Sequence, residues 1–155
     1  MGKYITTLCL IVGGIVPIIV DIGSSHLFNP DWDAHARVHE VWRLSTNFLI
    51  FCLGIYLLWV KKNEVLPAFL SLCIHLGFVF SAATMSLYGG AATGEGVPEP
   101  LIIGIPLNVF MFSTMFLIQS AVLIFTLKQS VTEEWFTFTN TSYFIINNDN
   151  LSLFI

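Results

Sequence analysis

The sequence contains few charged residues and few cysteines. Six of its 155 residues are lysine or arginine and ten are aspartate or glutamate, which gives a net charge of −4. Without a basic patch, nucleic acid is not an expected partner. The three cysteines, Cys9, Cys52 and Cys73, form no Cys-x-x-Cys pair. We therefore interpret them as packing residues and not as a redox-active thiol pair.

Hydrophobic residues, in contrast, are abundant. They make up 55% of the chain, and the mean hydropathy is +0.81, which is far above the usual range of a soluble domain. Crossing a bilayer takes about 20 mostly apolar residues, and four stretches satisfy this length. We predict an all-α, integral membrane four-helix up-down bundle over residues 1–128 and a polar C-terminal tail over residues 129–155. The expected spans cover about residues 4–22, 41–60, 66–88 and 101–127.

The basic residues predict how a multi-pass protein of this kind is oriented. Lys3 gives only a thin basic region before a long apolar run, so we interpret the first run as a span and not as a cleaved signal peptide. By the positive-inside rule, the N-terminus and the C-terminus are expected on the cytoplasmic side, and the segment between the first two spans on the outer side. Arg37 and Arg43 in that segment weaken the signal. The lysines that carry it are Lys3, Lys61, Lys62 and Lys128.

The segment from Ser25 to Arg43 holds most of the residues that are capable of chemistry. It contains three of the four histidines and both arginines. Asn29 followed by Pro30 is typical of a helix N-cap and first turn, so we expect the second helix to run from Pro30 to Trp59. Such a helix measures about 45 Å, which exceeds the roughly 30 Å of the hydrocarbon layer. Its first turns are therefore expected to extend beyond the membrane.

The histidine spacing in this segment predicts a metal site. His35 and His39 stand one helical turn apart, where two imidazoles can bind one ion, and Asp31 one turn earlier adds an oxygen. Such nitrogen and oxygen ligands suit one transition metal ion, copper, zinc or iron. The candidate ligands are His26, Asp31, His35 and His39, with Asp21 or Asp33 in reserve.

The same residues also have a simpler interpretation. Capping explains Asp31, an i,i+4 ion pair explains Asp33 with Arg37, and histidine and tryptophan are common at a membrane boundary. If these residues do bind a metal and the site is catalytic, we expect one coordination position of the metal to stay open for water or oxygen, as in an oxidoreductase. Arg37 and Glu40 then support the ligands from outside.

Two further functions remain open from the sequence. His75 lies near the middle of the third span and Asp21 at the end of the first, so the two are candidate proton-transfer groups of a metal-free enzyme acting on a lipid-like substrate. Alternatively, the protein is a non-catalytic accessory subunit, whose polar outer segment and Asn-rich tail are docking surfaces. The expected partners are then the lipid bilayer and either other membrane subunits or further copies of the chain.

The string Phe28-Asn-Pro-Asp-Trp-Asp-Ala-His-Ala-Arg-Val-His39 resembles a segment of small four-span membrane proteins of bacteria and fungi. In that family, an F-N-P-x-W-x-x-H-A-R-x-H-like string follows the first span. The resemblance covers the first third of the chain and implies four spans but no activity. A looser similarity is to the metal-bearing subunit of copper membrane monooxygenases, where an Asp and two His at the outer end of a helix bind the metal with a different spacing.

Overall fold

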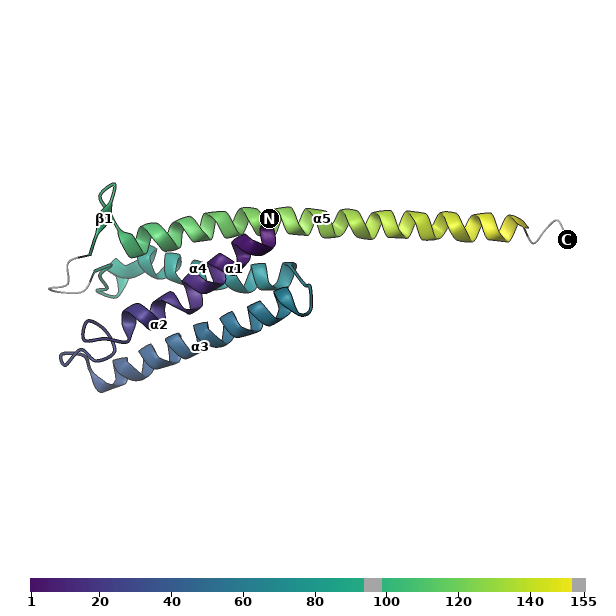
Figure 1. Ribbon diagram of the computed structural model, residues 1–155. Coiled ribbons are helices and arrows are strands. Elements are labelled where there is room, and N and C mark those ends of the chain that lie inside the picture. The colour runs from purple at the N-terminus through teal and green to yellow at the C-terminus, as the bar shows by residue number, and fades with distance from the viewer. Residues whose placement is uncertain (94–98, 152–155) are drawn as a thin grey trace. The chain divides into compact units, whose positions relative to one another are not determined.

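The computed structural model describes residues 1–93 and 99–151 (Figure 1). The described residues are mostly helical and include one small antiparallel sheet. Along the sequence, the elements are α1 (Gly2–Gly14), α2 (Val16–Asp21), α3 (Ala34–Trp59), α4 (Val65–Thr84), the 3-10 helix η1 (Met85–Leu87), β1 (Leu101–Ile102), β2 (Ile105–Pro106) and α5 (Leu107–Leu151).

Four helical stretches in the described part of the chain are long and apolar enough to cross a membrane. Their number and approximate positions agree with the four predicted spans, which indicates a multi-pass membrane protein. The stretches are Gly2–Asp21, Ala34–Trp59, Val65–Leu87 and Leu107–Thr132.

The first stretch is broken between α1 and α2, as its glycines and proline suggest. The break lies at Ile15, and Pro17 stands in the first turn of α2, where its missing N–H is not needed. At Gly14 the helix approaches α3 so closely that an added Cβ would meet the Cβ of Phe51 and lie 3.0 Å from the carbonyl oxygen of Asn47. The small residue therefore sets the distance between the two helices.

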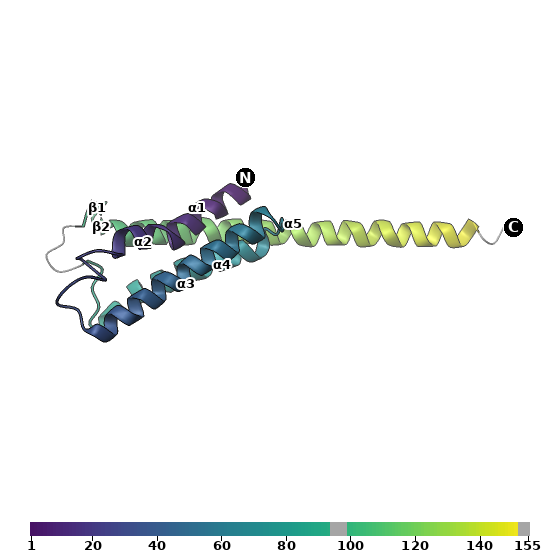
Figure 2. The ribbon, with the colours of Figure 1, turned by 60° about the horizontal axis from the view of Figure 1, so that its bottom comes forward.

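Residues 1–123 form one compact unit and residues 124–155 a second one, with α5 contributing to both. In the first unit, α1 packs against both α3 and α4, and α3 packs against α4 (Figure 2). Apolar side chains such as Leu10, Leu58 and Ala68 are fully buried there. The core also holds four buried polar side chains from α1, α4 and α5, which are Thr6, Ser71, His75 and Gln119.

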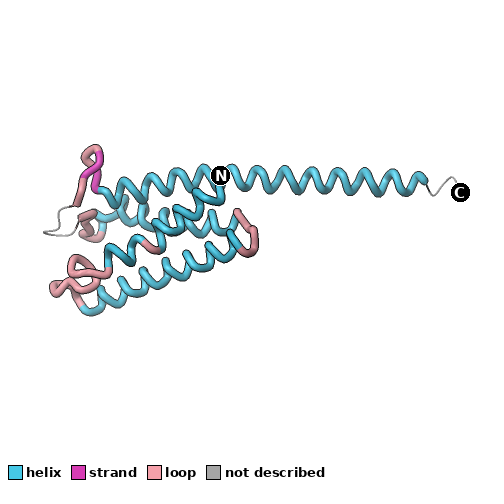
Figure 3. The backbone as a smooth tube through the Cα atoms, viewed as in Figure 1, coloured by secondary structure: helices cyan, strands magenta, loops and turns pink. Residues whose placement is uncertain are grey.

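The fourth span begins later than predicted because a hairpin precedes it. Strands β1 and β2 pair Leu101 with Pro106 and Ile102 with Ile105 (Figure 3). Ile103 and Gly104 connect them, both at positive φ, as a two-residue hairpin turn requires. The expected span began at about residue 101, whereas α5 starts at Leu107, after the hairpin.

The segment predicted as a polar tail, residues 129–155, continues α5 as far as Leu151, and residues 152–155 lie outside the described part. No glycine or proline occurs after Pro106, so nothing in the sequence breaks the helix. Low hydropathy ended the predicted span, but it does not end a helix.

The second predicted helix begins four residues later than expected, at Ala34 instead of Pro30. Asp33 is its N-cap and accepts a hydrogen bond from the backbone N–H of His35 at 2.8 Å. Asn29 instead accepts a bond from the N–H of Asp31 at 3.0 Å, a local turn that competes with helix formation. The 26 residues of α3 still measure about 39 Å, more than the roughly 30 Å of a hydrocarbon layer.

Candidate functional site

His35 and His39 lie side by side in the first two turns of α3. Their Nε2 atoms are 3.0 Å apart and their ring centroids 4.5 Å apart. Both side chains are exposed, and the ring of Trp42 stacks on His39 with a centroid distance of 6.0 Å. The i,i+4 spacing thus brings two imidazole nitrogens together at the exposed start of the helix.

The other two predicted ligands lie elsewhere. His26 contacts the hydroxyl of Ser25 through Nδ1 at 3.0 Å, and its Nε2 is 3.8 Å from a carboxylate oxygen of Asp21. Asp31 belongs to the turn made by Asn29. Since α3 begins after Asp31, this carboxylate does not stand one helical turn before His35. Within the described residues, no group of three or more His, Cys, Asp or Glu side chains is positioned to hold a metal.

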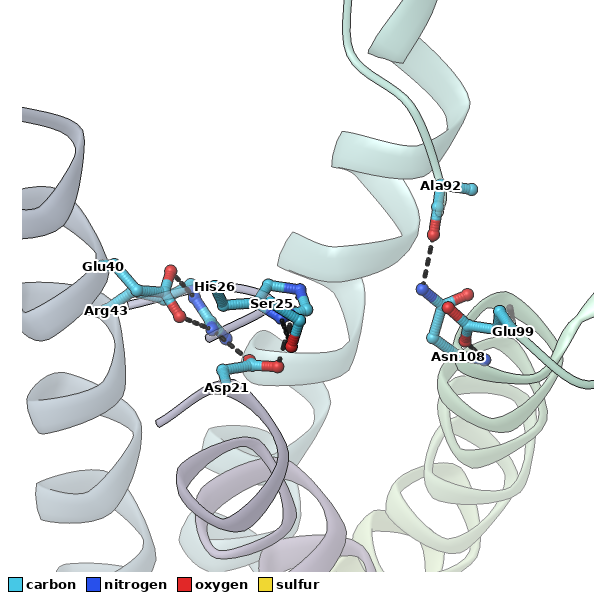
Figure 4. Close-up of polar contacts among 8 residues, drawn as sticks. All are labelled: Asp21, Ser25, His26, Glu40, Arg43, Ala92, Glu99 and Asn108. Carbon is cyan, nitrogen blue, oxygen red and sulfur yellow. Dashed lines mark hydrogen bonds and ion pairs between the residues drawn. The ribbon is translucent and has the colours of Figure 1, made fainter. Parts of the chain in front are cut away.

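A cluster of three charged side chains joins α2 to α3. Arg43 donates hydrogen bonds to the carboxylates of both Asp21 and Glu40 (Figure 4). The carboxylates are largely withdrawn from water, with side-chain exposures of 16% for Asp21 and 10% for Glu40, against 42% for Arg43. Two acids share one base, so the cluster carries a formal charge of −1, and His26 adjoins it through Asp21.

The two residues expected to support metal ligands have other roles. Glu40 belongs to the cluster with Arg43, and Arg37 donates to the backbone carbonyls of Asn29 at 2.8 Å and Pro30 at 3.4 Å. The predicted ion pair of Arg37 with Asp33 is therefore replaced by bonds to the loop. Asp33 caps the helix, and a carboxylate in that position already has a partner in the backbone.

An open apolar groove of about 200 Å³ adjoins the charged cluster, between α2, the following loop and α3. It is lined by Ile18, Ile22, Leu27, Val41, Leu44, Ser45 and Phe48.

His75 is fully buried in the core between α1, α4 and α5. Its Nδ1 lies 2.7 Å from the carbonyl oxygen of Ser71, and its ring centroid is 5.5 Å from that of Phe112. A Cβ added at Gly13 would lie 3.4 Å from its Cε1. Among the described residues, no contact joins His75 to Asp21, whose partners are Arg43 and His26. The predicted proton-transfer pair is thus divided between the core and the charged cluster.

The sequence reasoning missed the role of three residues. Arg43 organises the charged cluster, and its signal was a lone arginine at the start of an apolar run, three residues after Glu40. Ser71 and Gln119 are both fully buried, with side-chain atoms that lack a hydrogen-bond partner. Their signal was polarity inside predicted spans, which indicates that a side chain faces other helices but not which side chain it meets.

A comparison of the chain with protein-family models, with curated proteins and with solved structures found no match.

Proposed function

We propose that the protein is a multi-pass membrane protein with four antiparallel spans and that His35 and His39 bind one transition metal ion at the outer end of its bundle. The up-down arrangement is supported by the connecting segments. The loop after α2 and the segment after η1 lie at one end of residues 1–123, and the turn between α3 and α4 lies at the other (Figure 3). The lysines at the second end and at the N-terminus support a cytoplasmic location for that end.

The single observation that carries the metal proposal is the 3.0 Å separation of the two Nε2 atoms. Two nitrogens that each lie about 2.0 to 2.1 Å from one ion are about 2.9 to 3.4 Å apart for angles from 90° to tetrahedral. The pair therefore needs little movement to chelate an ion. Without an ion, one ring can donate a hydrogen bond to the other between the same two Nε2 atoms.

The surroundings of the pair favour an ion over a purely structural contact. Asp33 orders the backbone of the first turn of α3 through the N–H of His35, and the ring of Trp42 stacks on that of His39. Their exposure leaves the remaining coordination positions open to water. Imidazole nitrogens suit copper, zinc or iron, and an open position on copper or iron is the arrangement that oxidation chemistry requires.

The test is elemental analysis of the detergent-purified chain after gentle chelation of loosely held ions. We expect about one equivalent of metal per chain, held with the two-histidine chelate, and its loss in His35→Ala/His39→Ala. The matched control is His26→Ala/Asp31→Ala, which removes the two predicted ligands that lie elsewhere. Metal loss in this control as well would enlarge the site to four residues. Absence of metal from folded wild-type protein would refute the proposal.

The orientation is tested separately, in a chain whose cysteines are first replaced by serine. A single cysteine is introduced by Asp31→Cys or by Asn63→Cys, and intact cells are treated with a membrane-impermeant maleimide. We expect labelling at position 31 and protection at position 63. The reverse pattern would place the histidine pair on the cytoplasmic side without affecting the metal proposal.

A further inference from the structure

Three polar atoms in the core of residues 1–123 have no hydrogen-bond partner among the residues that the structure describes. They are Ser71 Oγ, His75 Nε2 and Gln119 Oε1, all in side chains with 0% exposure. Among the described residues, the one other buried side-chain atom in this state is Arg37 Nε, which lies outside this core. Burying a polar atom without a partner costs about as much free energy as a lost hydrogen bond, so three such atoms in one core require an explanation.

The bonds that these residues do make define what the free atoms can accept. A carbonyl oxygen only accepts, so His75 Nδ1 carries the proton that bonds Ser71 O at 2.7 Å, and Nε2 presents a lone pair. Gln119 donates its amide to Thr6 Oγ1 at 3.3 Å, which leaves Oε1 as an acceptor. The hydroxyl of Ser71 can donate and accept. The core therefore offers two acceptors and one mixed group to a small hydrogen-bond donor.

The three atoms belong to successive levels of the same core. At one level, His75 contacts Phe112 of α5 and lies next to Gly13 of α1. Seven residues away on each of those helices, about 10 Å along the axis, Gln119 bonds Thr6. Ser71 stands one turn before His75 on α4, between the two levels. The three free atoms thus lie at successive levels of the interface between α1, α4 and α5, and we call this set the polar column.

We propose that water molecules occupy this column and carry protons to His75 Nε2. Buried water typically bonds about three polar groups that would otherwise have no partner, and the column offers such groups. A proton passes from water to water and binds Nε2 reversibly to give an imidazolium ion, with no other bond made or broken. Next to His75, the ring of Phe112 stacks on Phe78 with centroids 4.4 Å apart.

None of the side chains named below that face His75 is a carboxylate or a second histidine, so His75 is the expected proton acceptor of this core. On α1, the titratable side chain next to Gly13 on the same face is Cys9, whose Sγ lies 3.7 Å from Met115 Sδ of α5. On α5 the facing side chain is Phe112, and on α4 it is Ser71.

The first test is deuterium exchange at the Cε1–H of each histidine, measured by mass spectrometry on the full chain in lipid nanodiscs. This exchange proceeds through the protonated ring, so it reports the access of both protons and water. We expect His75 to exchange within about tenfold of the partly exposed His26 in the same molecule. Exchange at His26 with none detectable at His75 would mean a dry core and would overturn the proposal in the wild-type chain alone.

A pair of serine variants tests the column itself. Ser71→Ala removes a hydroxyl with no protein partner, and Ser120→Ala is the matched control, because its hydroxyl already donates to Phe116 O of its own helix at 2.7 Å. In a hydrated core, Ser71→Ala slows exchange at His75 and lowers the melting temperature by about 2 °C. In a dry core, the same change raises the melting temperature by relieving an unpaired hydroxyl. The control is expected to leave exchange at His75 unchanged.

Discussion

The charged cluster and the polar core differ in whether their polar atoms have hydrogen-bond partners. In the cluster, which borders water, Arg43 bonds both Asp21 and Glu40. In the core, where water is harder to reach, atoms of Ser71, His75 and Gln119 have no protein partner. The cost of desolvation alone would favour the reverse, because an unpaired polar atom costs most where solvent cannot replace the missing bond.

This difference distinguishes polar contacts that stabilise the fold from polar atoms that stability alone does not explain. The cluster ties the loop after α2 to α3 and is explained by stability alone. The core is not explained in this way, because apolar side chains at positions 71 and 119 would fill the same space without an unpaired atom. Buried polar atoms that have no protein partner cost stability and are found where a ligand, a proton or water is bound.

The largest effect is expected from breaking the cluster at its only base. Arg43→Met leaves two poorly exposed carboxylates without a counter-charge, and we expect a loss of about 2 to 3 kcal/mol in the free energy of unfolding. The measurement is equilibrium unfolding in mixed micelles. In an Asp21→Asn/Glu40→Gln background the same substitution is expected to cost less than about 1 kcal/mol, since no carboxylate is left unpaired. Equal costs in both backgrounds would mean that the cluster does not act as a unit.

The cluster also shows where prediction from sequence stopped. Hydropathy and length are properties of single segments, and they predicted four helices long and apolar enough to cross a membrane, which the described part of the chain contains. The joining of Asp21 to Arg43 connects residues 22 positions apart, and no local pattern specifies which carboxylate reaches which base. For the same reason the sequence grouped His26 with His35 and His39, whereas the fold places it beside Asp21.

The second largest effect is expected in the core, at the glycine that faces His75. A Cβ at Gly13 would lie 2.9 Å from Cγ2 of Ile74, a stiff β-branched side chain, and 3.4 Å from Cε1 of His75. Gly13→Ala must push α4 away, and we expect it to cost about 1 to 2 kcal/mol of unfolding free energy.

The matched control for this change is Gly77→Ala. Gly77 lies inside α4, and an added Cβ there meets nothing within 4 Å. Its replacement is expected to stabilise the protein by about 0.5 kcal/mol through helix propensity alone. If the two substitutions shifted stability in the same direction, the close packing of α1 against α4 would be wrong.

Helix ends were the part of the fold least accessible to prediction. Asn29-Pro30 and Asp33 are both acceptable starts for the second helix, and one turn separates them. The structure begins the helix at Ala34 because Asn29 bonds the N–H of Asp31 within the loop and Arg37 holds the carbonyls of Asn29 and Pro30. That four-residue difference removes Asp31 from the histidine pair, so a local capping competition decides which ligands the candidate site contains.

A smaller effect is expected at the cap that orders the histidine pair. Asp33→Ala removes the bond to the N–H of His35, and we expect a loss of about 1 kcal/mol, confined to the first turn of α3. Amide hydrogen exchange over residues 34–38 measures it. Asp31→Ala removes the same charge two residues earlier, where the hydrogen bond to Asn29 involves the backbone N–H and not the carboxylate, so it is expected to leave this exchange unchanged. Faster exchange in both variants would mean that charge near the helix start, and not capping, orders the pair.

The smallest effect is expected where the cluster meets solvent. His26 lies 3.8 Å from Asp21, its side chain is 36% exposed, and Arg43 already bonds the same carboxylate. His26→Gln should therefore change the unfolding free energy by less than about 0.5 kcal/mol, as is usual for an exposed ion pair. Equilibrium unfolding beside Arg43→Met provides the comparison. A cost for His26→Gln as large as that for Arg43→Met would mean that the cluster needs a second positive charge, and His26 would then be bound to it too firmly to reach a metal at His35 and His39.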